Sequence, residues 1–320
     1  MVPYAEHLCR AMDEQHYSHY DLHRDLWNGS LYGFLRKEYR RLFEQLASAP
    51  IPPRIELHYV GPGMNHPCLA QPVWEPILQH VDAVHLYDID PRVLTHVADA
   101  LPRLWNRTIA PRVQVHVTDI TQGMGRALLD WSRFLLDGRK PPTAPTAAYF
   151  EGAVRTDGHM AGRRHEAAEG SLPLVISEMA VSSTGLGVFW ELYESAACSS
   201  LGITPEFINQ VERVYNTCIV RAHLRWIRRL LQGQGMAVVS ADVERDYLGD
   251  KRRCSTPTLA APLPSLFRPL SFRVESAPES VWQDIPIESA SSIPPHVHRV
   301  VCCTATDLGH GLPHEWWTPS

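Results

Sequence analysis

The sequence predicts an α/β protein built on a doubly wound, mostly parallel β-sheet. Short apolar runs typical of strands recur along the chain, and a helical segment follows the second of them. Each of the first three runs, at 55–60, 83–87 and 113–117, leads into a glycine or an acid. Because such sheets bind ligands at the carboxyl ends of their strands, these three ends predict a pocket for a nucleoside-containing cofactor.

The first strand runs into a glycine turn. Residues 55–60 are mostly apolar and β-prone, and Gly61, Pro62 and Gly63 end the run sharply. Glycine permits a positive φ and a close approach of a ligand to the backbone. The turn lacks the later glycines of the dinucleotide fingerprint, and the chain contains no P-loop. Taken alone, the turn supports a ligand-free strand-to-helix connection about as well as a ligand site.

The second strand ends in an acid that suits a ribose. Residues 83–87 form the run, and Asp88 follows Gly63 by close to the roughly 20 residues that separate the glycine loop from the ribose acid in doubly wound folds. A carboxylate can accept hydrogen bonds from both adjacent ribose hydroxyls. Asp90, followed by proline, is typical of the N-cap of a helix over 92–104. Asp88 is therefore the ribose candidate, and Asp90 is the helix cap.

A third strand and its acid complete a pattern that resembles a known family. Residues 113–117 are typical of a strand, and Asp119 follows after one threonine. The segments GPG, LYDID and VTDIT, in this order, resemble the first three cofactor motifs of class I S-adenosylmethionine-dependent methyltransferases. The likeness continues through strands at 174–178 and 236–241 and covers about residues 55–242.

The resemblance implies a Rossmann-like fold, namely an α/β doubly wound, mostly parallel seven-stranded sheet with an N-terminal helical cap. It also implies S-adenosyl-L-methionine as cofactor and a transferase of small-molecule biosynthesis, above all a methyltransferase. In that family the loop glycines lie against the methionine part of the cofactor. The resemblance implies that Asp88 binds the ribose and that Asp119 binds the adenine amino group. The cofactor contacts implied in this chain are Gly61, Pro62, Gly63, Asp88, Ile89, Asp119, Ile120 and Ser177.

Candidates for the acceptor side lie at the fourth strand and outside the sheet. Glu178 ends the fourth strand and is the acid best placed to act as a general base or to hold an amine, although it could equally orient a loop. Tyr149 is the second catalytic candidate, at the pocket wall. The aromatic N-terminal segment suggests a small, partly flat or apolar acceptor. The expected substrate contacts are Tyr20, Trp27, Tyr32 and Ser182.

The expected domains are an N-terminal helical cap over 1–50 and an S-adenosylmethionine-binding Rossmann-like domain over 51–320. Apolar residues recur at helical spacing from Leu31 to Leu46, but helices simply packed on the sheet would explain them equally well. A loop or lid insertion is expected at 137–170, where Pro, Gly and Ala dominate.

The C-terminal region shows strand patterns without the helix expected between them. Residues 271–275 and 298–306 are typical of strands, and the resemblance implies that the last one is antiparallel. The helix that usually precedes it is missing or very short, so the C-terminal topology stays open.

A second enzyme class fits the same cofactor motifs. The segment YDIDP, followed by a strand that ends in T-D, is also similar to nicotianamine synthases and related enzymes. These enzymes break a different carbon–sulfur bond, so that the aminocarboxypropyl arm is transferred or cyclises to azetidine-2-carboxylate and methylthioadenosine is released. A non-catalytic cofactor-binding partner subunit is the third alternative.

Composition limits the remaining classes. The formal net charge is −5, which gives no indication of a nucleic-acid surface. No apolar run has the length of a membrane span, and the N-terminal residues lack the plan of a signal peptide. Seven cysteines without framework spacing fit reduced thiols in a cytoplasm. The histidine pairs lack acids at metal-ligand spacing, so no metal is expected. A small-molecule substrate and a homodimer are the expected partners, with no membrane or nucleic acid.

Overall fold

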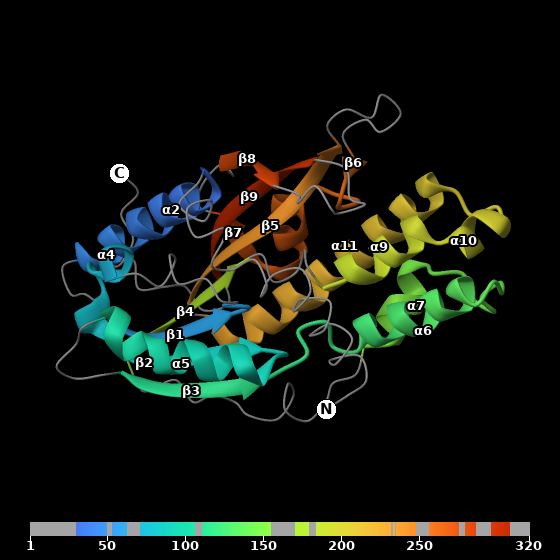
Figure 1. The fold of residues 1–320 in the computed structure, drawn as a ribbon. Coiled ribbons are helices and arrows are strands. Elements are labelled where there is room, and N and C mark those ends of the chain that lie inside the picture. The colour runs from blue at the N-terminus through green and yellow to red at the C-terminus, as the bar shows by residue number, and fades with distance from the viewer. Residues whose placement is uncertain are drawn as a thin grey trace.

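The structure is a computed structural model in which helices cover both faces of a central sheet (Figure 1). It describes residues 30–49, 53–62, 71–105, 111–154, 170–178, 184–231, 233, 235–247, 256–274, 279–285 and 296–307.

The sheet follows the order β3-β2-β1-β4-β5-β9-β7, and the first five strands of this path are parallel. The order reverses between β1 and β4, and this reversal is the topological switch point at which doubly wound sheets bind ligands. Two further strands branch off, β6 beside β5 and β8 beside β9. The predicted seven-strand path is therefore confirmed. The strands are β1 (Arg54–Val60), β2 (Val81–Asp88), β3 (Arg112–Val117), β4 (Ser171–Glu178), β5 (Met236–Tyr247), β6 (Thr256–Pro257), β7 (Phe272–Val274), β8 (Glu279–Ile285) and β9 (His296–Asp307).

A separate hydrophobic core lies on each face of the sheet. One core packs side chains of β1, β2 and β4 against α2, α4 and α5, and the other packs the opposite face against α6, α9 and α11. Successive side chains of a strand point to opposite faces of the sheet, so Tyr59 and Val60 of β1 lie in different cores. The helices are α2 (Ser30–Ala47), α4 (Gln71–Trp74), α5 (Pro91–Trp105), α6 (Met124–Leu136), α7 (Ala147–Gly152), α9 (Leu186–Glu194), α10 (Ala196–Ser200), α11 (Pro205–Leu231) and α12 (Leu263–Phe267).

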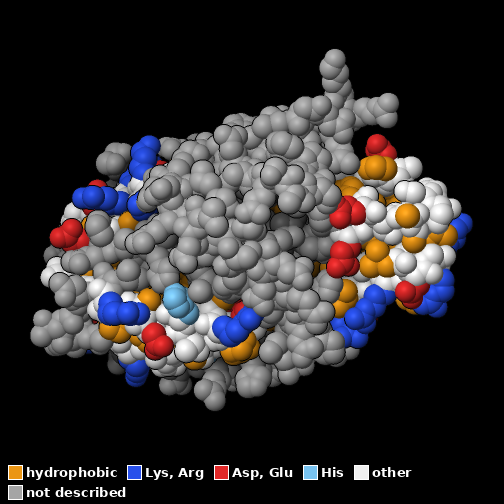
Figure 2. All heavy atoms as spheres, in the orientation of Figure 1, with side chains coloured by type: hydrophobic (Ala, Val, Ile, Leu, Met, Phe, Trp, Pro, Cys, Tyr) orange, Lys and Arg blue, Asp and Glu red, His pale blue; other side chains and the backbone are white. Residues whose placement is uncertain are grey.

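A helical group of α6, α7, α9, α10 and the first half of α11 lies to one side of the sheet (Figure 1). Over this group, acidic, basic and apolar side chains appear next to one another on the face shown in Figure 2. The second half of α11 continues onto the sheet and packs against β4 and β5. A single helix of 27 residues thus joins the group to the sheet.

The first described helix, α2, packs on a sheet face. Four residues of the predicted stripe are buried, and so is Phe43, which the stripe did not include. The Phe43 ring contacts Trp74 of α4, with 4.6 Å between centroids. It also contacts β8 and β9. Residues 1–29 lie outside the described part of the chain, so an N-terminal cap over the substrate pocket stays a prediction. The predicted stripe is Leu31, Phe34, Leu35, Tyr39, Leu42 and Leu46, of which Leu35, Tyr39, Leu42 and Leu46 are buried.

Part of the expected loop at 137–170 is instead a packed helix. The Thr146 hydroxyl caps α7 by accepting a hydrogen bond from the Tyr149 backbone N–H. Phe150 is fully buried, with its ring edge-on to Tyr215 of α11. The expectation of an unpacked segment is wrong for residues 147–152, because one aromatic side chain anchors a short helix within a composition rich in Pro and Ala.

The C-terminal strands show the topology that the sequence left undecided. Strand β9 runs antiparallel to β5 over most of its length, and β7 pairs with the end of β9. Both strands were predicted from their patterns. The only α-helix described between β5 and β9 is the five-residue α12, followed by a 3-10 turn over Arg268–Leu270, which explains why no helical periodicity is visible there. Among the described residues, no helix is both long and apolar enough to cross a bilayer.

Gly185, the residue before α9, is packed so tightly that an added methyl group should lower the stability of the fold. A Cβ on Gly185 would lie 2.7 Å from Tyr215 Cε1 and 2.9 Å from Phe189 Cε2. We expect Gly185→Ala to lower the free energy of unfolding by about 1–3 kcal/mol, because overpacking strains a dense core. Urea unfolding measures this change. Gly152→Ala is the matched control, since its Cβ would meet nothing within 4 Å. Equal midpoints for the two variants would contradict the expected strain.

Candidate functional site

The ends of the first three strands are joined by backbone hydrogen bonds. The Gly61 N–H donates to the Tyr87 carbonyl, and the Thr118 N–H donates to the Asp88 carbonyl, both at 2.8 Å. Gly61 has φ +64°, a left-handed conformation that glycine adopts without strain. Gly61 therefore has the positive φ that the sequence implied, and it lies beside the end of β2.

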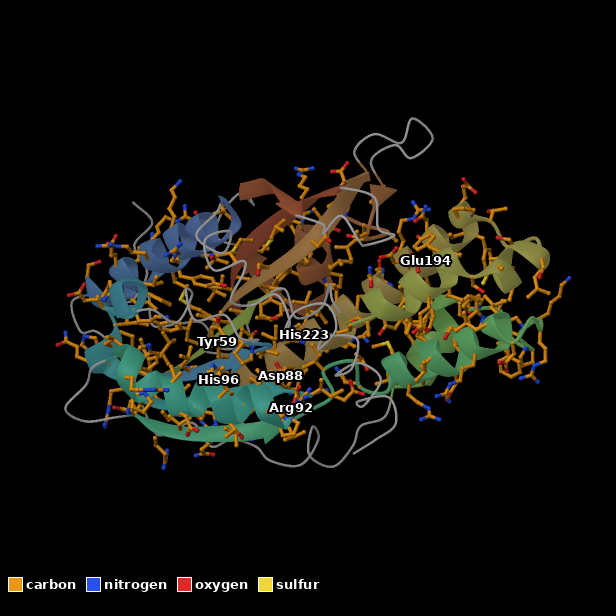
Figure 3. All side chains as sticks on the ribbon, in the orientation of Figure 1. Tyr59, Asp88, Arg92, His96, Glu194 and His223 are labelled. Atoms are coloured by element: carbon orange, nitrogen blue, oxygen red, sulfur yellow. The ribbon has the colours of Figure 1, made fainter. Side chains whose placement is uncertain are left out.

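The two acids after β2 have different roles. Asp90 Oδ1 accepts the Arg92 N–H at 2.9 Å, and its carboxylate pairs with the Arg92 guanidinium at 2.6 Å, so Asp90 is the N-cap of α5 as predicted. Asp88 lies at the end of β2 (Figure 3) and its side chain is 8% exposed. Its Oδ1 accepts the Asp90 N–H at 3.0 Å. This bond fixes the Asp88 carboxylate at the strand end.

Asp119 organises the turn that follows β3. Its Oδ1 accepts the Thr121 N–H at 2.9 Å and the Thr121 hydroxyl at 2.6 Å, and its Oδ2 accepts the Gly123 N–H at 3.1 Å. An ionised carboxylate offers about four acceptor sites, so three donors leave capacity for one more. Gln122 in this turn has φ +54°, and its side chain donates to the Ala222 carbonyl of α11 at 3.0 Å.

Ser177 points into the core. Its Oγ lies 2.8 Å from Nε2 of His223 on α11, and both residues are fully buried. Because the hydroxyl faces α11, a ligand at the strand ends would meet the backbone of Ser177 rather than its side chain. Sequence reasoning did not find His223. The detectable signal was a histidine within the apolar stripe of a long helix.

Burial of His223 predicts a dependence of stability on pH. Desolvation lowers the pKa of His223 from 6.5 to about 3. In the unfolded chain His223 therefore binds a proton below about pH 6.5, whereas in the native state it stays neutral down to about pH 3. Stability should fall with falling pH in this window, by up to about 1.4 kcal/mol per pH unit. We expect urea unfolding of the wild type to show this slope and His223→Gln to lack that part of it. Parallel slopes in the two proteins would contradict the assignment.

A row of polar rings crosses β1, β2 and β3 on the α11 face of the sheet, buried on β1 and β2 and partly buried on β3. His58 Nδ1 lies 2.9 Å from the Tyr87 hydroxyl. His85 lies 2.9 Å from Glu56 Oε1 and 3.1 Å from His116 Nε2. This row was not predicted from the sequence, although polar residues at every second position of these strands indicate it. Within the described ranges, no group of three or more side chains has the arrangement of a metal site.

The remaining predicted residues are placed only in part. Glu178 is the last residue of β4 and pairs with Ser240 of β5, but its side chain lies outside the described part of the structure. The Tyr149 hydroxyl donates to the Ala127 carbonyl of α6 at 3.0 Å. Burial raises the pKa of Tyr149, with a further contribution from Asp130, so it is held as the neutral phenol.

Pro62 and Ile120 are buried and Ile89 is partly buried, next to the strand ends where they were expected. Tyr32 lies in α2, but its side chain is not described. The predicted residues that lie outside the described ranges altogether are Gly63, Tyr20, Trp27 and Ser182.

The fold and the site together define a Rossmann-like protein with a candidate ligand site at the switch point of its sheet. Val60 of β1 pairs with Ser177 of β4, so the glycine turn emerges beside the end of the fourth strand. Gly61, Asp88 and Asp119 lie at the ends of three adjacent strands on one side of this switch point.

Comparison with known proteins finds similar chains only among solved structures. No protein-family model and no curated protein matches the chain. NodS, an N-methyltransferase from Bradyrhizobium japonicum in complex with S-adenosyl-L-homocysteine, is 10% identical with TM-score 0.32, covering 83% of this chain and 86% of that chain. A TehB-like SAM-dependent methyltransferase from Corynebacterium glutamicum is 10% identical with TM-score 0.33, covering 91% and 98%. Precorrin-6y C5,15-methyltransferase from Geobacter metallireducens is 12% identical with TM-score 0.33, covering 84% and 88%.

The strand order of the chain itself defines its doubly wound fold.

Proposed function

We propose that the protein is an S-adenosylmethionine-dependent transferase that acts on a small molecule, and specifically a methyltransferase. The observation that carries the proposal is the set of three polar strand ends. A left-handed glycine, a nearly buried carboxylate and a second carboxylate follow β1, β2 and β3 in that order. A nucleoside joined to an amino-acid part without any phosphate group suits this order of groups.

The residues present fit this cofactor by the chemistry of their donors and acceptors. The Gly61 backbone would face the methionine part, Asp88 would accept from the ribose hydroxyls, and the remaining acceptor capacity of Asp119 would take one adenine N–H. The glycine turn lacks the later glycines of the dinucleotide fingerprint. Arg92, the cation next to the ribose candidate in sequence, is paired with Asp90. The incomplete fingerprint supports S-adenosylmethionine over a phosphate-bearing dinucleotide.

Reaction requires alignment and removal of one proton. When bound, the cofactor supplies a carbon activated by the sulfonium sulfur. The chain would hold the acceptor in line with that carbon and exclude water from it. Glu178, whose backbone is fixed by pairing with Ser240, is the group proposed to take the proton of the acceptor. The product would leave as a methylated small molecule.

Transfer or cyclisation of the aminocarboxypropyl arm is the second candidate function, favoured by the YDIDP segment. Incubation of the protein with S-adenosylmethionine, with and without small-molecule extracts, separates the two reactions by the thioether released. We expect S-adenosylhomocysteine only when an acceptor is present. Methylthioadenosine without an acceptor would instead establish arm chemistry. Retention of S-adenosylhomocysteine without either product would favour the non-catalytic partner subunit.

A further inference from the structure

One turn of α11 contacts the ends of three strands. The Ala222 carbonyl accepts the Gln122 side-chain amide at 3.0 Å, in the turn that Asp119 organises. The indole of Trp226 packs edge-on to the Tyr87 ring, with centroids 5.1 Å apart, next to Asp88. The same helical turn therefore supports both carboxylates proposed to hold the nucleoside.

His223 completes this support at the fourth strand. Its Nε2 lies 2.8 Å from Ser177 Oγ, and Ser177 immediately precedes Glu178 in β4. The Ser240 hydroxyl is directed to the Ser177 carbonyl at 3.5 Å, so β5 braces the same strand end. Figure 3 labels His223 on α11 and Asp88 on β2, and so marks the helix and one of the strand ends that it serves.

A histidine is a costly choice for this position. The imidazole is fully buried, and among the described residues its Nδ1 has no hydrogen-bond partner. A leucine would fill a similar volume without burying an unsatisfied nitrogen. The hydrogen bond to Ser177 is the one polar contact of this ring in the described part of the chain that offsets such a cost.

We propose that His223 is a positioning residue of the candidate site, which fixes the end of β4 through Ser177 and thereby the backbone that carries Glu178. The inference rests on the proposed function. The ring stays neutral at working pH, because burial lowers the pKa of His223 to about 3, so it holds one arrangement instead of shuttling protons. Its role is to keep the strand end in register with the two carboxylates beside it.

Three variants test the role, with affinity for S-adenosylhomocysteine measured by calorimetry. His223→Leu removes the nitrogen, and we expect affinity to fall about tenfold, as for one lost hydrogen bond. His223→Gln keeps an amide nitrogen within reach of Ser177 and should restore affinity to within about threefold of the wild type. Asn216→Leu is the matched control, because Asn216 of α11 is also buried and its side chain donates to the Thr258 carbonyl, away from the strand ends. It should lower stability but leave affinity unchanged.

Ser177→Ala removes the same hydrogen bond with a smaller change of volume, so it replaces His223→Leu if that variant does not fold. The double variant of Ser177→Ala and His223→Leu should bind no more weakly than His223→Leu alone, since both delete one interaction. Wild-type affinity in His223→Leu or Ser177→Ala overturns the positioning role and leaves the proposed function standing. Equal losses in Asn216→Leu overturn it too, because they indicate general destabilisation. Absence of binding to the wild type overturns the proposed function and this inference together.

Discussion

Replacing Asp88 with alanine is expected to weaken binding of S-adenosylhomocysteine by roughly two orders of magnitude or more. The expected contacts are two hydrogen bonds from ribose hydroxyls to an ionised carboxylate, each worth about 1.5–3 kcal/mol. Asp88 is nearly buried at the end of β2, and the Asp90 N–H holds its carboxylate in place. Calorimetric titration measures the loss directly. Asp88→Asn should be intermediate, because the amide retains one acceptor and loses the charge.

Asp90→Ala is the matched control for this prediction. Asp90 lies two residues away, is also buried, and is used as the N-cap of α5 and the partner of Arg92. Its removal should cost about 0.5–2 kcal/mol of stability through the lost cap and should leave affinity near the wild-type value. If Asp90→Ala abolishes binding while Asp88→Ala keeps it, the assignment of the two acids is reversed and wrong.

Replacing Trp74 with alanine is expected to have the largest effect on stability, a loss of about 3–5 kcal/mol. The indole is fully buried, and three aromatic rings surround it: Phe43 at 4.6 Å, Trp105 at 5.4 Å and Tyr59 at 6.2 Å between centroids. These rings come from α2, α5 and β1, so the substitution opens a cavity where three elements meet. Urea unfolding followed by near-UV circular dichroism measures the loss.

Phe207→Ala is the control for the loss of an aromatic ring as such. Phe207 is 37% exposed on α11, so its removal should change stability by less than about 1 kcal/mol. Trp74 belongs to the core on the sheet face opposite to α11. Binding of S-adenosylhomocysteine by the folded fraction of Trp74→Ala should therefore persist. Equal destabilisation by the two substitutions would contradict the cavity argument.

The part of the site that could be predicted is local in sequence. Gly61, Asp88 and Asp119 each follow a strand whose apolar pattern is visible, and parallel pairing necessarily brings such ends to one edge. The role of Asp90 as a cap was predictable for the same reason, because a cap depends on residues one turn away. Predicting these positions did not require knowing which helices pack on which face of the sheet.

The part that could not be predicted depends on contacts between distant segments. Ser177 and His223 are 46 residues apart, and their pairing follows from how α11 crosses β4. The row of His58, His85 and His116 exists only because of the register between three strands. The helix α7 was missed because its anchor is a single Phe150, which a composition argument does not weigh.

The continuity of α11 has a mechanical consequence. A helix of 27 residues spans about 40 Å, and after its first residue this one contains neither proline nor glycine, where kinks usually form. One continuous helix without a kink-forming residue after Pro205 thus joins the helical group to the sheet. We expect the group and the sheet to move together, because this helix has no position at which a hinge usually forms.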